Sequence, residues 1–118
     1  MSAASADRLR IQSSGCLLIA GDVKDSKFCK QAVERTVQEF DRLDILVNNA
    51  AFQLHADKLE DVSDERLEET MKTNIFGYFY MARAAIPHLK QGGSIINTGS
   101  VVGLRGRAVE WVNRVRRR

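Results

Sequence analysis

The chain has 118 residues, of which 44% are hydrophobic and 28% are charged. This is the balance of a globular protein, and the length suffices for one small domain and no more. No apolar run approaches the roughly 20 residues that a membrane helix needs, so we expect no membrane span. Residues 1–14 are small and polar and lack the apolar core of a secretory signal, which predicts a cytoplasmic protein.

The positive charge is concentrated at one end of the chain. The formal net charge is +3, but residues 101–118 contain six arginines against one glutamate, so the first hundred residues are slightly acidic. The body of the protein therefore gives no electrostatic reason to expect a nucleic acid partner. Because Cys16, Cys29, His55 and His88 lack the spacing of metal ligands, we expect neither a metal site nor a disulfide framework.

The first half of the chain predicts a strand followed by a helix. Residues 16–20 read Cys-Leu-Leu-Ile-Ala, a continuous apolar run that is typical of a strand covered on both faces. A polar stretch follows, in which Asp25 or Ser26 could cap a helix. Apolar residues then recur at helical spacing up to Phe40, with charged residues between them, which predicts an amphipathic helix of three to four turns.

The second half repeats this alternation. Residues 43–47 form another apolar run of the buried-strand type. Ser63 or Asp64 is expected to open a long helix, which Pro87 and the Gly-Gly pair beyond it bring to an end. Residues 94–98 form the third predicted strand.

The order strand, helix, strand, helix, strand predicts an α/β fold with a doubly wound parallel sheet. In such sheets, ligands bind beyond the carboxyl ends of the strands. We therefore expect the residues that follow the three strands to line one edge of the sheet: Asp22 and Val23, then Asn48, Asn49 and Ala50, then Gly99 and Ser100.

Four segments in this order resemble motifs of the short-chain dehydrogenase/reductase family. Gly-Asp-Val at 21–23 is similar to the pair that contacts the adenine ring, and Asn-Asn-Ala-Ala at 48–51 is similar to the Asn-Asn-Ala-Gly motif that ends the family's fourth strand. Residues 73–77 resemble the segment that holds the helix asparagine, and residues 93–100 resemble the strand that delivers the catalytic serine. One such motif is weak evidence, but four in order are strong. The resemblance implies part of a Rossmann-like sheet, with three strands and two main helices.

The chemistry implied by this resemblance is reversible hydride transfer between NAD or NADP and the carbon of a small-molecule alcohol or carbonyl compound. Ser100 would hydrogen-bond the substrate oxygen, and Asn74 would hold a water that links a family lysine to solvent. The cofactor would be contacted by Asp22 at the adenine amino group, by Val23 on the ring, and by Asn49, Ala50 and Ala51 near the ribose. Homo-oligomers are implied for the intact family member.

Each of these polar residues also has a simpler structural interpretation. Asn48 is expected mainly to tie neighbouring strands together through its amide. Asn49 could be only a turn former, Asn74 could be solvated or could bend its helix, and Ser100 could be a turn residue after glycine. The two tyrosines of the long helix are expected to pack rather than to react.

The sequence also departs from the family pattern at both ends. The family's glycine-rich phosphate turn has no counterpart before residue 16, and its Tyr-x-x-x-Lys pair is missing, since no tyrosine follows Tyr80 and no lysine follows Lys90. We therefore expect residues 1–103 to be a partial NAD(P)-binding domain. Residues 104–118 are expected to be an unrelated basic tail, which a frameshift, a random extension or a purposeful anion-binding tail would explain.

Three functions follow from these observations and stay open at the level of the sequence. The first is an oxidoreductase of the short-chain type that is inactive as this fragment. The second is a non-catalytic interaction protein that pairs with an intact relative. The third is a gene fragment without a function of its own.

Overall fold

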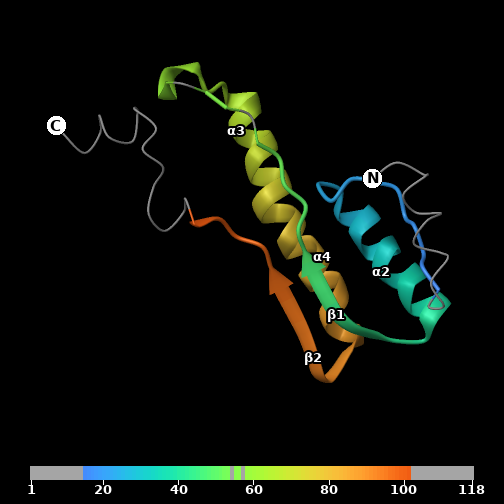
Figure 1. Ribbon diagram of the computed structural model, residues 1–118. Helices are drawn as coiled ribbons and strands as arrows, with labels where there is room; N and C mark the ends of the chain where they lie inside the picture. Colours follow the sequence, from blue (N-terminus) through green and yellow to red (C-terminus); the bar gives the residue numbers. More distant parts are fainter. Residues whose placement is uncertain (1–14, 54, 57, 102–118) are drawn as a thin grey trace.

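A computed structural model describes residues 15–53, 55–56 and 58–101 of the chain (Figure 1). Its main elements, in chain order, are α2 (Ser26–Phe40), β1 (Leu43–Asn48), α3 (Asp64–Met71), a π-helical turn (Lys72–Phe76), α4 (Gly77–Ala85) and β2 (Leu89–Asn97). Short 3₁₀ turns occupy Leu59–Asp61 and Ile86–His88. The N-terminal stretch 1–14 and the expected basic tail 104–118 lie outside the described residues.

Helix α2 forms where the amphipathic pattern predicts it. The Asp25 side chain caps it by accepting a hydrogen bond from the backbone N–H of Lys27 at 2.9 Å. At the other end, Asp41 adopts the left-handed conformation, with φ of 59°, and its N–H bonds the carbonyl of Val37. The helix buries Cys29, Ala32 and Val33 against the rest of the fold, so the expected apolar stripe is confirmed at its centre.

The long helix also begins where the sequence predicts it. Ser63 is its N-cap, and the hydroxyl accepts a hydrogen bond from the backbone N–H of Arg66 at 3.3 Å. The element is not uniform, because a π-helical turn separates α3 from α4 while the helical path continues through all three segments (Figure 1). None of the described helices is both long enough and apolar enough to cross a membrane.

The sheet consists of β1 and β2, which pair in parallel. Their register aligns Leu46 with Ile95 and Asn48 with Asn97, and an irregularity interrupts the pairing between Leu43 and Ile45. Two parallel strands with an intervening helix confirm the α/β fold class and the parallel connection.

The first strand predicted from the sequence, at residues 16–20, does not form. Residues 16–20 are extended chain without strand pairing, so the expectation of a three-stranded sheet is wrong for the described residues. Among the predicted strands, residues 16–20 come directly before the segment that resembles the family's fourth strand, so they would correspond to the third strand. In a doubly wound sheet of order 3-2-1-4-5-6, the third strand is separated from the fourth by two others. The apolar run of residues 16–20 therefore has the composition of a strand but no adjacent strand with which to form a hydrogen-bonded ladder.

The two faces of the sheet differ in their covering. On one face, Leu46 packs with Val33 of α2 and Ala85 of α4 to form the core (Figure 1). On the other face, Ile45 and Val47 of β1 are each 57% exposed. The expectation that both faces of residues 43–47 are buried is therefore wrong, because both helices that contact β1 lie on one side of the sheet.

Candidate active site

The register of the sheet brings two of the sequence motifs to one edge. Asn48 and Asn97 are paired across the strands, and the backbone N–H of Thr98 donates to the carbonyl of Asn48 at 2.9 Å. The segments that follow, residues 49–51 and residues 99–100, therefore leave the sheet side by side. All five residues are exposed, as a ligand-contacting edge requires.

Asn48 itself serves to hold this edge together. Its side chain is only 5% exposed, and Nδ2 donates to Oδ1 of Asn97 at 2.8 Å and to the backbone carbonyl of Tyr78 at 3.5 Å. Tyr78 donates its own hydroxyl to the carbonyl of Thr98 at 3.3 Å. The predicted structural role of Asn48 as a tie between strands is confirmed, and the tie extends to α4.

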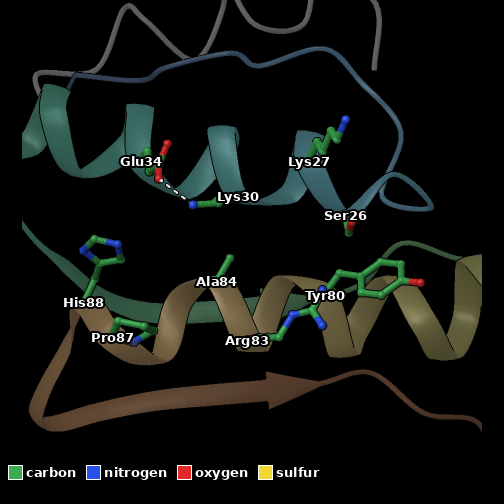
Figure 2. Close-up of a pocket in the computed structure, with 9 residues that line it drawn as sticks. All are labelled: Ser26, Lys27, Lys30, Glu34, Tyr80, Arg83, Ala84, Pro87 and His88. Atoms are coloured by element: carbon green, nitrogen blue, oxygen red, sulfur yellow. Dashed lines mark ion pairs between the residues drawn. The ribbon is translucent and has the colours of Figure 1, made fainter.

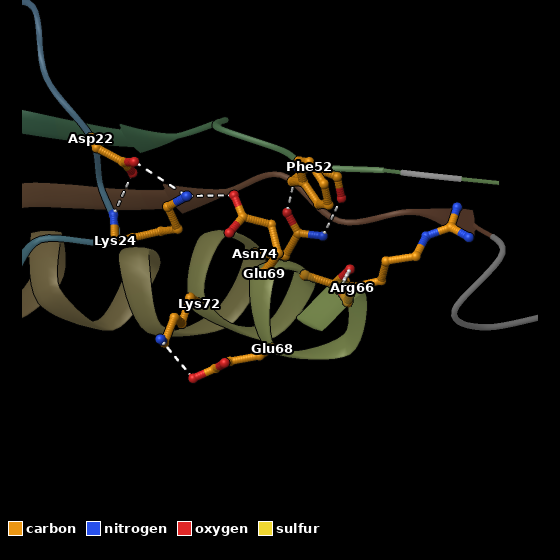
Figure 3. A network of polar contacts seen from close by, with 9 residues as sticks. Asp22, Lys24, Phe52, Arg66, Glu68, Glu69, Lys72 and Asn74 are labelled. Carbon is orange, nitrogen blue, oxygen red and sulfur yellow. Dashed lines mark hydrogen bonds and ion pairs between the residues drawn. The ribbon is translucent and has the colours of Figure 1, made fainter. Parts of the chain in front are cut away.

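Asn74 lies in the π-helical turn and holds the loop that follows β1. Its Oδ1 accepts from the backbone N–H of Phe52 at 2.8 Å, and its Nδ2 donates to the carbonyl of the same residue at 2.9 Å (Figure 3). This pair of bonds anchors the chain directly after Ala51. The side chain is thus neither simply solvated nor unpaired, and π-helical turns of this kind occur frequently at functional sites.

The Asp22 and Val23 segment is attached to the same helical stretch through Lys24. The backbone N–H of Lys24 donates to Oδ1 of Asp22 at 2.9 Å, and its ammonium group lies 3.3 Å from Oδ2 and also pairs with Glu69 on α3 (Figure 3). The backbone hydrogen bond, aided by the Lys24 charge, lowers the pKa of the Asp22 carboxyl. The bond to Glu69 in turn raises the pKa of the Lys24 ammonium group.

Val23 rests against α4 at Gly77, where a side chain could be added only if Val23 moved. A Cβ placed on Gly77 would lie 2.9 Å from Cγ2 of Val23 and 3.2 Å from its carbonyl oxygen. The Cys29 thiol donates to that same carbonyl at 3.3 Å, and burial raises the pKa of this thiol, which keeps it protonated as a donor. The close approach of Gly77 and the Cys29 hydrogen bond therefore both fix the position of Val23.

Sequence reasoning missed the residues that support the site. Lys24 and Glu69 are 45 positions apart, so no local pattern indicates their pairing. Gly77 carried a usable signal, because a glycine inside a helix costs stability and is usually kept for close packing.

The residues expected to contact a dinucleotide fit its adenosine half. Asp22 leaves 57% of its side chain exposed, so a carboxylate oxygen remains available to an amino group. Ala50 and Ala51 present small exposed side chains that permit close approach of a ribose. Among the described residues, no cluster of His, Cys, Asp or Glu is arranged to hold a metal ion.

Comparison with known proteins points to one family. The family model for short chain dehydrogenases matches residues 2–112. The chain is 50% identical over 99 residues to the uncharacterized oxidoreductase YhdF of Bacillus subtilis strain 168, covering 84% of this chain and 34% of that protein. It is 46% identical over 92 residues to a glucose and ribitol dehydrogenase of Daucus carota, covering 78% of this chain and 32% of that protein.

Solved structures agree with the sequence relatives. A short chain dehydrogenase from Burkholderia cenocepacia J2315 in complex with NADP superposes with a TM-score of 0.83 at 30% identity, covering 88% of this chain and 42% of that one. The chain belongs to the short-chain dehydrogenase family, and its described part has the α/β fold of that family. It spans about a third of the length of these curated relatives.

Proposed function

We propose that this chain supplies the adenosine-binding edge and half of the catalytic polar groups of an NAD(P)-dependent alcohol/carbonyl oxidoreductase. The observation that carries the proposal is the anchoring of the loop after β1, which begins at the edge where Asn48 pairs with Asn97 and is held by Asn74 through Phe52. Membership of the family and the NADP-bound neighbour support the choice of cofactor.

In this proposal the cofactor is the hydride donor or acceptor, and the chain's own residues bind and orient the cofactor and the substrate. Asp22 would accept a hydrogen bond from the adenine amino group, while Val23, held by Gly77, would pack on the ring. Asn49, Ala50 and Ala51 would lie beside the ribose. The NAD or NADP preference is left open by these residues.

Ser100 would hydrogen-bond the oxygen of a small alcohol or carbonyl substrate. Asn74 would position the β1 loop and organise water at the π-helical turn. Since the 118 residues contain no tyrosine beyond Tyr80 and no lysine beyond Lys90, this polypeptide would lack the group that moves the substrate proton. We therefore propose that this polypeptide does not turn over substrate by itself. We also propose that it acts in the cytoplasm.

Titration of NADPH fluorescence tests the binding part of this proposal. The 118-residue chain should change the fluorescence at sub-millimolar cofactor, in the range of ordinary cofactor affinities. Asp22→Ala should weaken binding about tenfold, because a hydrogen bond to a charged group is lost. Asp44→Ala is the matched control, since Asp44 is another exposed, ion-paired aspartate but lies near the opposite end of β1.

Two outcomes would contradict the proposal. One is no fluorescence change at all from a chain whose circular dichroism shows helix and strand. The other is equal weakening by Asp22→Ala and Asp44→Ala, which would indicate a general charge effect rather than a contact at the strand edge.

The uncovered sheet face favours a second candidate function, a non-catalytic partner of an intact relative. Exposed Ile45, Val47 and Ile96 lie on β1 and β2, where another chain could cover them. Co-expression with a full-length homologue, followed by size-exclusion chromatography, separates the two functions. A stable complex without NADPH binding would favour the partner function, whereas NADPH binding without a complex would favour the first. If the chain forms no complex and binds no NADPH, a fragment without a function of its own is favoured.

A further inference from the structure

The Lys24 ammonium group is shared between two carboxylates but lies closer to one of them. It donates a hydrogen bond to Oε1 of Glu69 on α3, a closer contact than its 3.3 Å ion pair with Oδ2 of Asp22 (Figure 3). Glu69 is also the main cause of the raised pKa of this ammonium group, and Asp22 contributes less. The ammonium group is therefore bound mainly by Glu69, and its pairing with Asp22 is the weaker of the two.

Asp22 does not depend on the ammonium group for its orientation. Its Oδ1 accepts from the backbone N–H of Lys24 at 2.9 Å, and this bond lowers the pKa of the carboxyl more than the Lys24 side chain does. Of the three side chains, Asp22 is the most exposed, at 57% against 35% for Glu69 and 26% for Lys24. A carboxylate has about four acceptor positions, so a donor that approaches from solvent still finds one open.

The other lysine pairs of the described chain are simpler. Lys30 meets Glu34 at 3.9 Å in the groove between α2 and α4, with 73% of its side chain exposed, and such a pair contributes little (Figure 2). Lys72 pairs with Glu68 at 2.7 Å on another side of the long helix, away from the strand edge (Figure 3). Among the residues that the structure describes, only the Lys24 ammonium group reaches two carboxylates.

We propose that Glu69 is a positioning residue for adenine recognition, because it holds the Lys24 ammonium group off Asp22 and leaves a carboxylate oxygen open to the amino group of the base. This role rests on the adenine contact of Asp22 in the proposed function. A carboxylate only accepts, so it favours adenine, which presents an amino donor, over hypoxanthine, which presents an oxygen at the same position. Without Glu69, the ammonium group pairs with Asp22 alone, and the base has to compete with a cation.

Fluorescence titration of the full chain with NADPH and with its hypoxanthine analogue tests this role, because the two cofactors differ only at the base. We expect the unmodified chain to prefer NADPH about tenfold, since the analogue loses a hydrogen bond to a charged group. Glu69→Ala should reduce this preference to about threefold, a change in the range of an exposed ion pair. A merely structural tie to α3 would weaken the binding of both cofactors equally and leave the preference unchanged.

Two further variants sharpen the test. Glu68→Ala is the matched control, since it removes a neighbouring carboxylate that pairs with Lys72, and it should leave the preference unchanged. Lys24→Met combined with Glu69→Ala should restore the preference toward about tenfold, because no ammonium group is left to occupy Asp22 while the backbone donor remains. The role of Glu69 is overturned if Glu69→Ala keeps the full preference, if Glu68→Ala reduces it as much, or if the double variant stays as low as Glu69→Ala.

A failure of the adenine contact itself is recognised separately. If Asp22→Ala keeps the preference, or if the chain binds neither cofactor, the assignment to adenine is overturned. The Asp22 midpoint measured by NMR then tests the position of the ammonium group without any cofactor. It should fall in Glu69→Ala, where the ammonium group pairs with Asp22 alone, and stay unchanged in Glu68→Ala. A midpoint that rises or stays the same in Glu69→Ala would overturn the sharing of the ammonium group as well.

Discussion

The helix-covered face and the bare face of the two-stranded sheet belong to the same strands, but their apolar side chains are buried to very different extents. On the covered face, Leu46 is 8% exposed and packs with Val33 and Ala85. On the bare face, Ile45 and Val47 are each 57% exposed although they are as apolar as Leu46. Alternate residues of one strand point to opposite faces of the sheet. The side chains on the face that the helices cover are therefore buried and contribute to the core, whereas those on the other face stay exposed.

This difference shows that the described segment keeps its local structure with only one face of its sheet covered. The caps, helices and parallel pairing depend on contacts within residues 25–97, and all of these are present. The predictions below test whether the covered face determines stability and the bare face determines association.

Leu46→Ala has the largest expected effect. It removes a buried side chain from the small core and should lower the free energy of unfolding by about 2–5 kcal/mol. In a chain of this size that is a large share of the total stability, so urea denaturation should lose its cooperative transition. Unchanged cooperativity would show that the core lies elsewhere.

Asn48→Ala tests the polar tie on the covered face. The change leaves the Asn97 side chain and the Tyr78 carbonyl without the Nδ2 donor, and should cost about 1–3 kcal/mol. A double-mutant cycle with Asn97→Ala, followed by urea denaturation, should give a coupling energy of about 1 kcal/mol. Strictly additive effects would show that the two amides do not interact.

Gly77→Ala tests the contact between α4 and the Asp22–Val23 segment. The added Cβ would lie 2.9 Å from Val23, so the segment must move. Helix propensity favours alanine by about 1 kcal/mol and offsets part of the overpacking cost of about 1–3 kcal/mol. The net loss of stability should therefore be small, while NADPH affinity should fall. A variant with unchanged affinity would place the adenine contact elsewhere.

The sequence predicted the elements that depend on local chemistry. Asp25 and Ser63 cap their helices because a short polar side chain before an amphipathic run satisfies the first free N–H groups. The parallel pairing of residues 43–48 with 94–97 followed from a helical crossover between two apolar runs. Placing Asn49 and Ser100 at one edge of the sheet required only that pairing.

The sequence could not predict features that depend on which elements lie beside a strand or on partners that are distant along the chain. Residues 16–20 have a strand's composition, yet composition cannot supply an adjacent strand. Ile45 has the pattern of a buried residue, yet it is exposed because none of the described helices packs on its face of the sheet. The contacts of Lys24 with Glu69 and of Asn74 with Phe52 depend on how a loop meets a helix, which no periodicity records. The roles of Ser100 and Asn74 in catalysis, and the domain boundary at residue 103, stay predictions.

The bare face should show a small effect on stability and a clear one on association. Ile45→Thr combined with Val47→Thr keeps residues that favour strands, so the free energy of unfolding should change by less than about 1 kcal/mol. Sedimentation velocity should show less self-association, because exposed apolar surface is removed. A loss of stability like that of Leu46→Ala would mean that this face is covered in solution.

The smallest expected effect is the titration of Asp22. Its carboxyl has a pKa below the ordinary 3.8, first because the backbone N–H of Lys24 donates to it and second because of the Lys24 ammonium group. A group with a lowered folded pKa stabilises the protein above its ordinary value, and this contribution is lost as pH falls through the lowered pKa. In Lys24→Gln, the Asp22 midpoint measured by NMR should rise toward 3.8 without reaching it, because the backbone donor remains. A midpoint fully restored to 3.8 would mean that the side chain, and not the turn of the backbone, holds this carboxylate at the edge where the adenine is expected.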